Sequence, residues 1–209
     1  MKVTVIKYNA GNIYSVVHAL NRLGIEPDVT DDAETIRKAD CVLFPGQGEA
    51  SKTMLYLKAH RLDSLIKTLK QPVLGICIGM QLMCSHSEEG DTDCLGIFDV
   101  TVKRFIADCN NHKVPHMGWD TLSKMNCPIF NGLQDDCYTY FIHSYYVPLN
   151  KYTVAENNYI QPFSAAIAKD NFYATQFHPE KSGNVGEKIL RNFLDLTASQ
   201  INQNKSNNA

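Results

Sequence analysis

The chain has 209 residues, of which 44% are hydrophobic and 20% charged, and its formal net charge is −2. This composition is typical of a soluble globular protein, and a chain of this length is expected to bury roughly 70% of its unfolded surface. The basic residues are scattered, which excludes the basic stripe of a nucleic-acid-binding surface. No apolar run approaches the ~18 residues of a membrane-spanning helix, and the N-terminal run is too short for a signal peptide.

The cysteine pattern argues against disulfides and zinc. The count is odd and no CxxC pair occurs, so neither a disulfide framework nor a zinc ribbon is expected. A reducing, cytoplasmic location fits better, and we expect no metal and no cofactor. The seven cysteines stand at positions 41, 77, 84, 94, 109, 127 and 137.

Short apolar runs and helical patterns alternate through the first part of the chain. Such alternation predicts a parallel α/β sheet, with active-site groups at the carboxyl ends of its strands. The expected strands are 3–6, 25–30, 41–44 and 73–76; the expected helices are 13–23, one from Asp31 or Asp32 to Lys38, 55–69 and 79–85.

The second half changes character. Four short β-like runs predict added antiparallel strands; they are 100–102, 138–142, 152–154 and 165–167. An amphipathic helix over 185–198 closes the pattern. We see no repeat or linker, and therefore expect one domain over residues 1–199, followed by a polar tail, 200–209, that is disordered.

Cys77 is the most informative residue. An apolar run leads to it, with Gly75 two residues before and Gly79 two residues after. This is the layout of a nucleophile elbow, a strand–turn–helix in which crowding excludes Cβ atoms at the flanking positions. A helix N-terminus beneath the sulfur favours the thiolate. A buried core cysteine is the alternative, and the two glycines favour the nucleophile.

His178 and Glu180 supply a base and its orienting carboxylate. In an extended segment, residues two apart point the same way, so Glu180 is expected to fix the tautomer of His178. A surface turn around Pro179 is the alternative. His116 and His143 rank lower as bases, because neither has a carboxylate two residues on.

The loop Pro45–Gly48 follows a predicted strand. It has three interpretations: a simple turn, a phosphate loop, or an oxyanion hole. No Gly-Lys-Ser/Thr follows, which disfavours phosphate. Backbone N–H groups of Gly46, Gln47 and Gly48, with that of Ile78, suit an oxyanion.

Two further residues have open roles. Gln81 stands about one turn beyond Cys77 and is expected either to contact substrate or to be solvated. Trp119, the only tryptophan, is either a core aromatic or an interface anchor.

These motifs resemble the class I, triad-type glutamine amidotransferases. The resemblance rests on the elbow Gly75–Gln81 and on the run Gln176–Ser182. Two more selective motifs, Tyr8–Ile13 with Ser15-Val16 and Pro115–Trp119, are similar to those of glutaminase subunits of imidazole glycerol phosphate synthases. The resemblance covers residues 1 to about 197.

The resemblance implies a flavodoxin-like, mostly parallel sheet and a Cys77–His178–Glu180 triad that hydrolyses glutamine through a thioester. It implies that glutamine is held by Gly46, Gly48, Gln81, Glu89, Ser144 and Tyr145. It also implies a (β/α)8-barrel cyclase partner that receives ammonia in histidine biosynthesis, facing Asn12, Trp119, Asp120 and Tyr140. Free ammonia is mostly protonated in water, so a dry internal path would preserve the nucleophile.

The sequence departs from the family pattern at three positions. Asp120 replaces a usual asparagine, which puts an interface hydrogen bond in question. Gln47 replaces a small apolar residue in the oxyanion loop, where the donors are backbone groups. Lys7 replaces a common aspartate, and no physical reason is evident.

Three rival functions fit parts of the same pattern. One is a glutaminase of another synthase, such as a surface-sugar paralogue, which Pro115–Trp119 disfavours. The second is a cysteine peptidase or chaperone-like protein of the same architecture, disfavoured by Gln81. The third is a non-catalytic subunit with a relict triad, against which the intact Cys77, His178 and Glu180 speak.

Overall fold

The computed structural model describes residues 1–8, 13–46, 48–107 and 112–207. Within them, the largest element is a seven-stranded sheet in the order β11-β12-β13-β4-β3-β1-β2. The strands from β13 to β2 are parallel, and β12 and β11 extend the sheet antiparallel. Its strands are β1 (Val3–Ile6), β2 (Asp28–Thr30), β3 (Cys41–Phe44), β4 (Val73–Ile76), β11 (Thr153–Asn158), β12 (Pro162–Lys169) and β13 (Phe172–Thr175).

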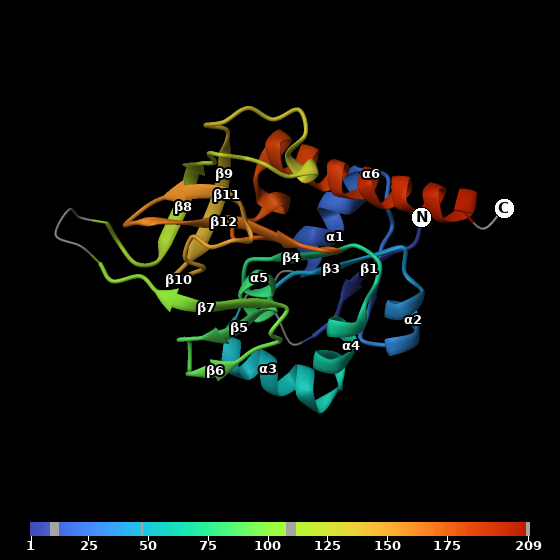
Figure 1. Cartoon of the computed structure of the whole chain (residues 1–209), viewed down its shortest axis with the longest axis horizontal. Helices are drawn as coiled ribbons and strands as arrows, with labels where there is room; N and C mark the ends of the chain where they lie inside the picture. The colour runs from blue at the N-terminus through green and yellow to red at the C-terminus, as the bar shows by residue number, and fades with distance from the viewer. Residues whose placement is uncertain (9–12, 47, 108–111, 208–209) are drawn as a thin grey trace.

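Helices cover both faces of this sheet (Figure 1). One face carries α1 (Ile13–Arg22) and α6 (Gly183–Asn207), and the other carries α2 (Ala33–Lys38), α3 (Ala50–Ala59), α4 (Leu62–Thr68) and α5 (Ile78–Met83). The flavodoxin-like α/β architecture expected from the sequence is confirmed. Within the described ranges, no helix is long and apolar enough to cross a membrane.

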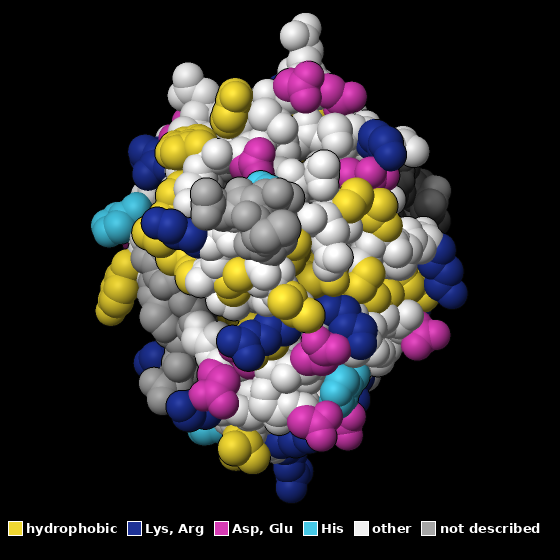
Figure 2. Space-filling model, turned by 90° about the vertical axis from the view of Figure 1, so that its left-hand side faces the viewer, with side chains coloured by type: hydrophobic (Ala, Val, Ile, Leu, Met, Phe, Trp, Pro, Cys, Tyr) yellow, Lys and Arg dark blue, Asp and Glu magenta, His cyan; other side chains and the backbone are white. Residues whose placement is uncertain are grey.

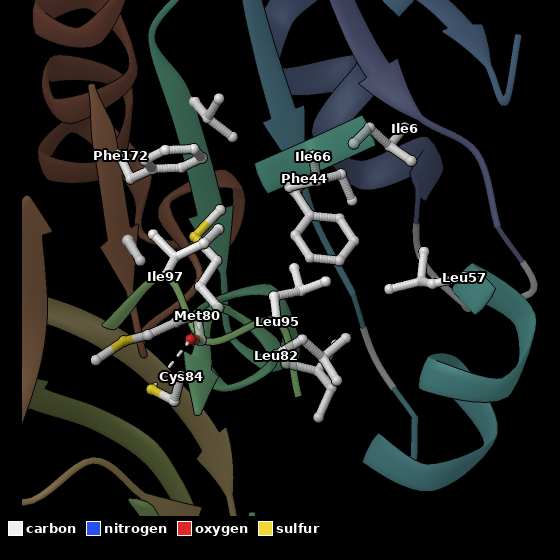
Figure 3. Close-up of a cluster of buried hydrophobic side chains, with 14 of the residues drawn as sticks. Ile6, Phe44, Leu57, Ile66, Met80, Leu82, Cys84, Leu95, Ile97 and Phe172 are labelled. Atoms are coloured by element: carbon white, nitrogen blue, oxygen red, sulfur yellow. Dashed lines mark hydrogen bonds between the residues drawn. The ribbon is translucent and has the colours of Figure 1, made fainter. Parts of the chain in front are cut away.

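Strand alternation explains the two cores. In β3, Cys41 and Leu43 belong to the cluster under α1 and α6, whereas Val42 and Phe44 belong to the cluster on the opposite face. Successive side chains of a strand point to opposite faces, so a strand that is apolar at every position fills both cores. Figure 3 shows the second cluster, in which Phe44 lies near residues of α4 and α5.

Two smaller sheets are added at one end of the large sheet. The first has the order β10-β7-β5-β6 and the second pairs β8 with β9. Their strands are β5 (Cys84–Ser87), β6 (Thr92–Asp93), β7 (Phe98–Arg104), β8 (His116–Thr121), β9 (Tyr138–His143) and β10 (Tyr145–Tyr146). The expected antiparallel additions are therefore present, although β5 and β7 pair in parallel.

Local sequence signals fix several element ends. Asp32 accepts a hydrogen bond from the backbone N–H of Thr35 at 2.7 Å, which identifies it rather than Asp31 as the N-cap of α2. Gly24, with φ of 79°, follows α1 in the left-handed conformation that glycine adopts without penalty.

Other boundaries differ from the expectation. The helix expected over 55–69 is two helices, because Arg61 between them has a φ of 56°. The helix after the elbow ends at Met83, and the chain enters β5 at once. Strand β2 begins only at Asp28, and β13 was not anticipated.

The end of the chain also differs. Helix α6 continues through Asn207, so most of the segment expected to be a disordered tail is helical. Extending an existing helix adds one hydrogen bond for each residue that is fixed, without a new nucleation step. The polar composition of 200–207 was therefore a poor guide to its backbone.

The first turn of α6 approaches the chain around Pro179 so closely that a Cβ on Gly186 would collide with the carbonyl oxygen of Pro179. Alanine normally stabilises a helix relative to glycine, but here we expect Gly186→Ala to lower the free energy of unfolding by about 1–3 kcal/mol. Urea unfolding measures this. Asn184→Ala, at an exposed position of the same turn, is the control, and equal stability of the two variants would contradict the clash.

Candidate active site

Cys77 occupies a strained turn between β4 and α5. Its backbone has φ of 55° and ψ of −109°, outside the regions that non-glycine residues normally populate. Such strain persists only where the surrounding structure holds it. Here the Cys77 N–H donates to the carbonyl of Thr175 in β13 at 2.8 Å. The strand, turn and helix of a nucleophile elbow are thus all present.

The two glycines are required by close backbone contacts, as the sequence predicted. A Cβ on Gly79 would collide with the carbonyl oxygen of Phe44. A Cβ on Gly75 would lie 3.0 Å from the carbonyl carbon of Gly79. The elbow therefore packs against its own helix and against β3, and larger residues at either position would displace the cysteine.

His178 reaches Cys77 because β13 lies beside β4. Thr175, the last residue of β13, pairs with Ile76, the last residue of β4. Cys77 and the run from Gln176 to His178 therefore leave the sheet at the same edge. Their separation of about one hundred residues along the chain becomes one strand spacing across the sheet.

Glu180 holds His178. Its Oε1 lies 2.7 Å from Nδ1 of His178, and both side chains are buried. The backbone is not extended as expected: Pro179–Lys181 forms a 3₁₀ turn, η2. The turn still brings the two side chains together, because proline fixes a φ compatible with helical geometry at its first position. The contact was therefore predicted, and the conformation that produces it was not.

The electrostatics favour a charged His178. Burial by itself would lower the pKa of His178, but the negative charge of Cys77 as a thiolate and that of Glu180 outweigh it and raise the pKa to about 10. The Nε2 atom is buried and has no hydrogen-bond partner among the residues that the structure describes. The Nε2 atom is thus not committed to a structural partner.

Beside Cys77 lies a cavity of about 340 Å³. The residues expected to bind substrate contribute much of its wall, namely Gly48, Ile78, Gln81, Glu89, Ser144 and Tyr145. Pro115, Ile142 and His143 also line it, and the sequence did not identify them as substrate-binding residues. Gly46 is not in the wall; a Cβ there would collide with Tyr8 and Ile78.

Gln81 is not solvated, so that alternative is wrong. Its side chain is buried, and its Nε2 donates to the carbonyl of Tyr145 at 2.9 Å and to Oε1 of Gln176 at 3.0 Å. Gln176 in turn places its Nε2 3.7 Å from the Cys77 sulfur. Gln176 was noted only as part of a motif, and nothing in its local sequence indicates this contact.

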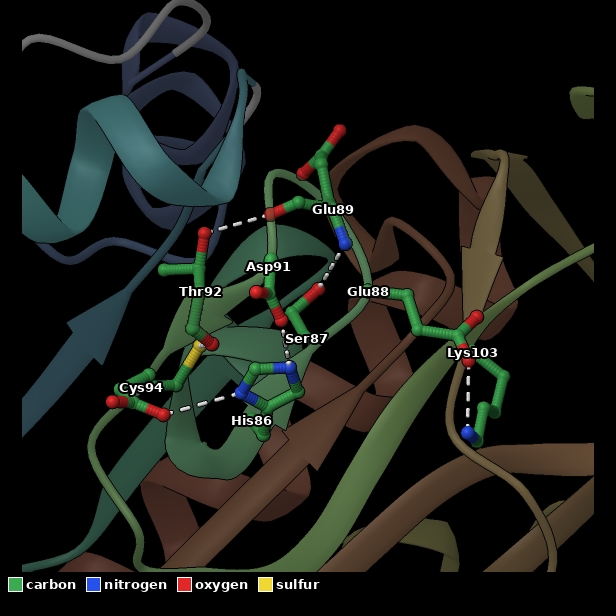
Figure 4. A network of polar contacts seen from close by, with 9 residues as sticks. His86, Ser87, Glu88, Glu89, Asp91, Thr92, Cys94 and Lys103 are labelled. Atoms are coloured by element: carbon green, nitrogen blue, oxygen red, sulfur yellow. Dashed lines mark hydrogen bonds and ion pairs between the residues drawn. The ribbon is translucent and has the colours of Figure 1, made fainter.

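Glu89 is carried by the turn between β5 and β6 (Figure 4). Its backbone N–H donates to the Ser87 hydroxyl at 3.1 Å, and its carbonyl accepts a hydrogen bond from the Thr92 hydroxyl at 2.7 Å. Its carboxylate accepts from the N–H of Ala50 at the start of α3, at 2.8 Å. Burial raises the pKa of Glu89, so a cation in the cavity would favour its ionised form.

The loop after β3 begins with a fixed carbonyl. The Tyr8 hydroxyl donates to the carbonyl of Pro45, and burial followed by the nearby Cys77 charge raises the pKa of Tyr8. Gly48 has a φ of 142°, which disfavours any other residue there. Gln47 lies outside the described residues, as does Asn12, and their expected roles stay predictions.

The β8–β9 ribbon presents aromatic and apolar side chains to solvent. Trp119 is 55% exposed and Met117 64% exposed, which excludes a core role for Trp119. Tyr140 packs edge-on against Trp119, with ring centroids 6.0 Å apart. On the side of the molecule seen in Figure 2, hydrophobic side chains lie among charges of both signs. Asp120 alternates to the other side of the ribbon and contacts His116 at 3.2 Å.

Among the residues that the structure describes, no cluster of three or more His, Cys, Asp or Glu side chains could hold a metal ion. The lining of the cavity contributes a thiol from Cys77, an imidazole from His143 and a carboxylate from Glu89.

The comparisons with known proteins agree with this geometry. A family model described as "Glutamine amidotransferase class-I" matches residues 4–196. The HisH protein of the imidazole glycerol phosphate synthase of Bacteroides thetaiotaomicron is 63% identical, over 94% of this chain and 100% of the relative. The HisH protein of Photorhabdus laumondii is 45% identical, with 94% and 100% covered. The fold is similar to that of a Thermoplasma acidophilum protein described as a candidate GMP synthase component, with a TM-score of 0.76, 22% identity and 98% of each chain covered.

The pairing of His178 with two negative charges has a consequence for stability. Its pKa is raised in the folded state, so the stabilisation is complete below the unfolded pKa of ~6.5 and is lost as the pH rises toward about 10. We expect the difference in unfolding free energy between the native chain and His178→Asn to be largest near about pH 6 and to shrink toward about pH 10. Urea unfolding at several pH values measures it. A difference that grows with pH would contradict the charged pair, and His60→Asn, at an exposed histidine, is the control.

Proposed function

The chain belongs to the class-I glutamine amidotransferases, and we propose that it is the glutaminase subunit of an imidazole glycerol phosphate synthase. In this proposal it hydrolyses L-glutamine to glutamate and ammonia and delivers the ammonia to a separate cyclase. The names of the relatives support the assignment. The observation that carries the chemistry is the Cys77 elbow beside the buried His178–Glu180 pair, at the wall of a cavity.

The first half of the reaction forms a thioester. Nε2 of His178 takes the proton of the Cys77 thiol, the sulfur attacks the side-chain amide carbon of glutamine, and the carbonyl π electrons move to oxygen. Nε2 of His178 gives its proton to the amide nitrogen as the C–N bond breaks, and ammonia leaves. Glu180 keeps the imidazole oriented and balances its charge throughout.

The second half restores the enzyme. Water takes the place of ammonia, His178 accepts one of its protons, and the hydroxide attacks the thioester carbon. Collapse of the second tetrahedral species expels the Cys77 thiolate and releases glutamate. His178 is then protonated again, and the cycle is complete. The raised pKa of His178, to about 10, supports its role in accepting this proton.

The oxyanion that forms in each half of the reaction needs hydrogen-bond donors. The N–H of Ile78, the first residue of α5, has no partner within its own helix, and Gly48 lines the same cavity. We assign Ile78 and the Gly46–Gly48 loop to this role. Loss of one such donor typically costs about 3 kcal/mol of barrier.

The remaining cavity residues suit the two ends of a free amino acid. Glu89 offers a carboxylate for the α-ammonium group. Gln81, Ser144 and Tyr145 also line the cavity and provide polar atoms for the carboxylate and side-chain amide. The cavity of about 340 Å³ has room for glutamine, and bound glutamine would shield the sulfur from water until ammonia has left.

The partner in this proposal is a (β/α)8-barrel cyclase, with which the chain forms a heterodimer in the cytoplasm. We assign Trp119 and Tyr140 to the contact, together with Asn12 and Asp120. The support is the exposure of Trp119 and Met117 on a ribbon whose end, with the residues that follow it (Ile142–Tyr145), lines the cavity. Ammonia that passes directly between the two sites avoids protonation in bulk water.

We expect Cys77→Ala to abolish glutamine-dependent synthesis in the complex and to leave ammonia-dependent synthesis by the cyclase intact, because only the nucleophile is lost. Product formation with each nitrogen source measures this. Cys94→Ala, at a cysteine away from the cavity lining, is the control. Substantial glutamine-dependent turnover by Cys77→Ala would refute the catalytic role.

Complementation separates this function from that of a surface-sugar paralogue. The native chain is expected to restore growth of a histidine auxotroph that lacks its own glutaminase subunit, and Cys77→Ala is expected to fail at low ammonia. Growth restored by neither form, together with active glutaminase in vitro, would favour another synthase.

The partner contact makes a second prediction. Because exposed tryptophans are frequent hot spots, Trp119→Ala should weaken cyclase binding by about 2 kcal/mol or more. Titration of glutaminase activity with cyclase measures the affinity. Leu55→Ala removes a side chain that is also exposed, at 69%, but lies on α3; it should bind normally. Equal affinities of the two variants would place the contact elsewhere.

A further inference from the structure

Two buried histidines lie outside the triad, and the reaction above does not use them. His116 of β8 and His143 of β9 are cross-strand partners, and Nδ1 of His116 lies 3.2 Å from Nε2 of His143. Nε2 of His116 lies 3.2 Å from Oδ2 of Asp120. Nδ1 of His143 lies 2.8 Å from the carbonyl of Tyr145. These contacts form one series of hydrogen bonds that runs from the Asp120 carboxylate to the carbonyl of Tyr145 at the cavity wall.

The directions of these hydrogen bonds fix the protons. A carbonyl only accepts, so Nδ1 of His143 carries a hydrogen. Burial lowers the pKa of His143 to about 3, so His143 is neutral and its Nε2 accepts. His116 must then donate from Nδ1. Asp120 faces the other nitrogen of His116.

Asp120 is ionised. Burial opposes this, but hydrogen bonds from His116, Asn157 and the N–H of Thr121 outweigh it and hold the pKa of Asp120 below its ordinary value. A carboxylate accepts, so Nε2 of His116 donates as well. The geometry thus requires His116 to donate from both nitrogens, to His143 and to Asp120.

The surroundings of His116 support a buried charge. Its ring stacks on Tyr159, with centroids 4.0 Å apart, and on Phe141, with centroids 4.8 Å apart. Aromatic faces attract a cation and offset part of the cost of removing it from water. The charged groups that face this series of hydrogen bonds are Asp120 at one end and His178, near His143, at the other.

This series of hydrogen bonds ends at the proposed substrate site. The carbonyl of Tyr145 accepts from both His143 and Gln81. Ile142, Ser144 and Tyr145 line the cavity on either side of His143, and the carbonyl of Ile142 lies 3.8 Å from the Cys77 sulfur. The tautomer of His143 therefore decides whether this part of the wall is held.

We propose that Asp120, His116 and His143 form a positioning relay that fixes the cavity wall Ile142–Tyr145 for the glutaminase reaction. The relay acts through the wall and touches no reacting atom. The relay rests on the proposed function. It also gives Asp120 a role that the usual asparagine would fill without charge. An asparagine amide can donate a hydrogen bond to a neutral His116 and leave the hydrogen bond between His116 and His143 unchanged.

The protonation states can be read directly by ¹⁵N NMR of histidine-labelled protein, with signals assigned from His116→Gln and His143→Gln. The relay requires two protonated nitrogens on His116 and a hydrogen only on Nδ1 of His143. In Asp120→Asn, His116 is expected to become neutral while His143 keeps its tautomer. A neutral His116 in the native chain, or the opposite tautomer of His143, would overturn the relay whether or not the chain is a glutaminase.

Kinetics test its consequence. With saturating cyclase, Asp120→Ala should raise KM for glutamine about tenfold, since a buried donor loses its partner, and change kcat by less than about threefold. Asp120→Asn should restore KM to within about threefold of the native value. Asp99→Ala, at an exposed position of β7, is the matched control.

The outcomes are distinguishable. Equal KM values for the alanine and asparagine variants would overturn the relay while the native chain remained an active glutaminase. A loss of cyclase affinity with normal KM at saturation would likewise overturn it, because it would make Asp120 an interface residue only. No glutaminase activity in any form would instead overturn the proposed function.

Discussion

The parallel pairing of β4 with β13 is the constraint on which the site depends. Because Ile76 and Thr175 pair at the ends of these strands, the chain leaves the sheet twice at one edge, once into Cys77 and once toward His178. The hydrogen bond from Cys77 N–H to the Thr175 carbonyl joins the two exits. Backbone pairing thus sets the relation between Cys77 and His178 before any side-chain contact is made.

The packing contacts and hydrogen bonds around this edge of the sheet hold a strained turn in place. The backbone of Cys77 is unfavourable by itself, and it is held by the packing of Gly79 against β3 and by the burial of α5 in the second core. Glu180 and η2 then fix the ring of His178, and α6 fixes η2 through the contact of Gly186 with Pro179. Rigid elements therefore support the reacting groups, as a preorganised site requires.

Two carboxylate–histidine pairs flank the cavity, and they differ in what they touch. Glu180 orients His178, whose free nitrogen faces the sulfur. Asp120 pairs with His116, which reaches the cavity only through His143. The first pair takes part in the proposed proton transfer, whereas the second is proposed to hold the wall. The same chemical unit serves two purposes because one nitrogen is left free in one case and committed in the other.

The sequence by itself determined the alternating sheet, because apolar periodicity and glycine spacing are local. The same holds for the elbow at Cys77 and for the meeting of His178 with Glu180, two residues apart. Tertiary structure alone decided that β13 lies beside β4, that Gln81 and Gln176 are buried together at the sulfur, and that His116 and His143 join. These contacts link residues that are far apart in the sequence, and local sequence patterns do not predict such contacts. The length of α6 and the break at Arg61 were also beyond the pattern, because helix ends depend on small differences between competing backbone hydrogen bonds.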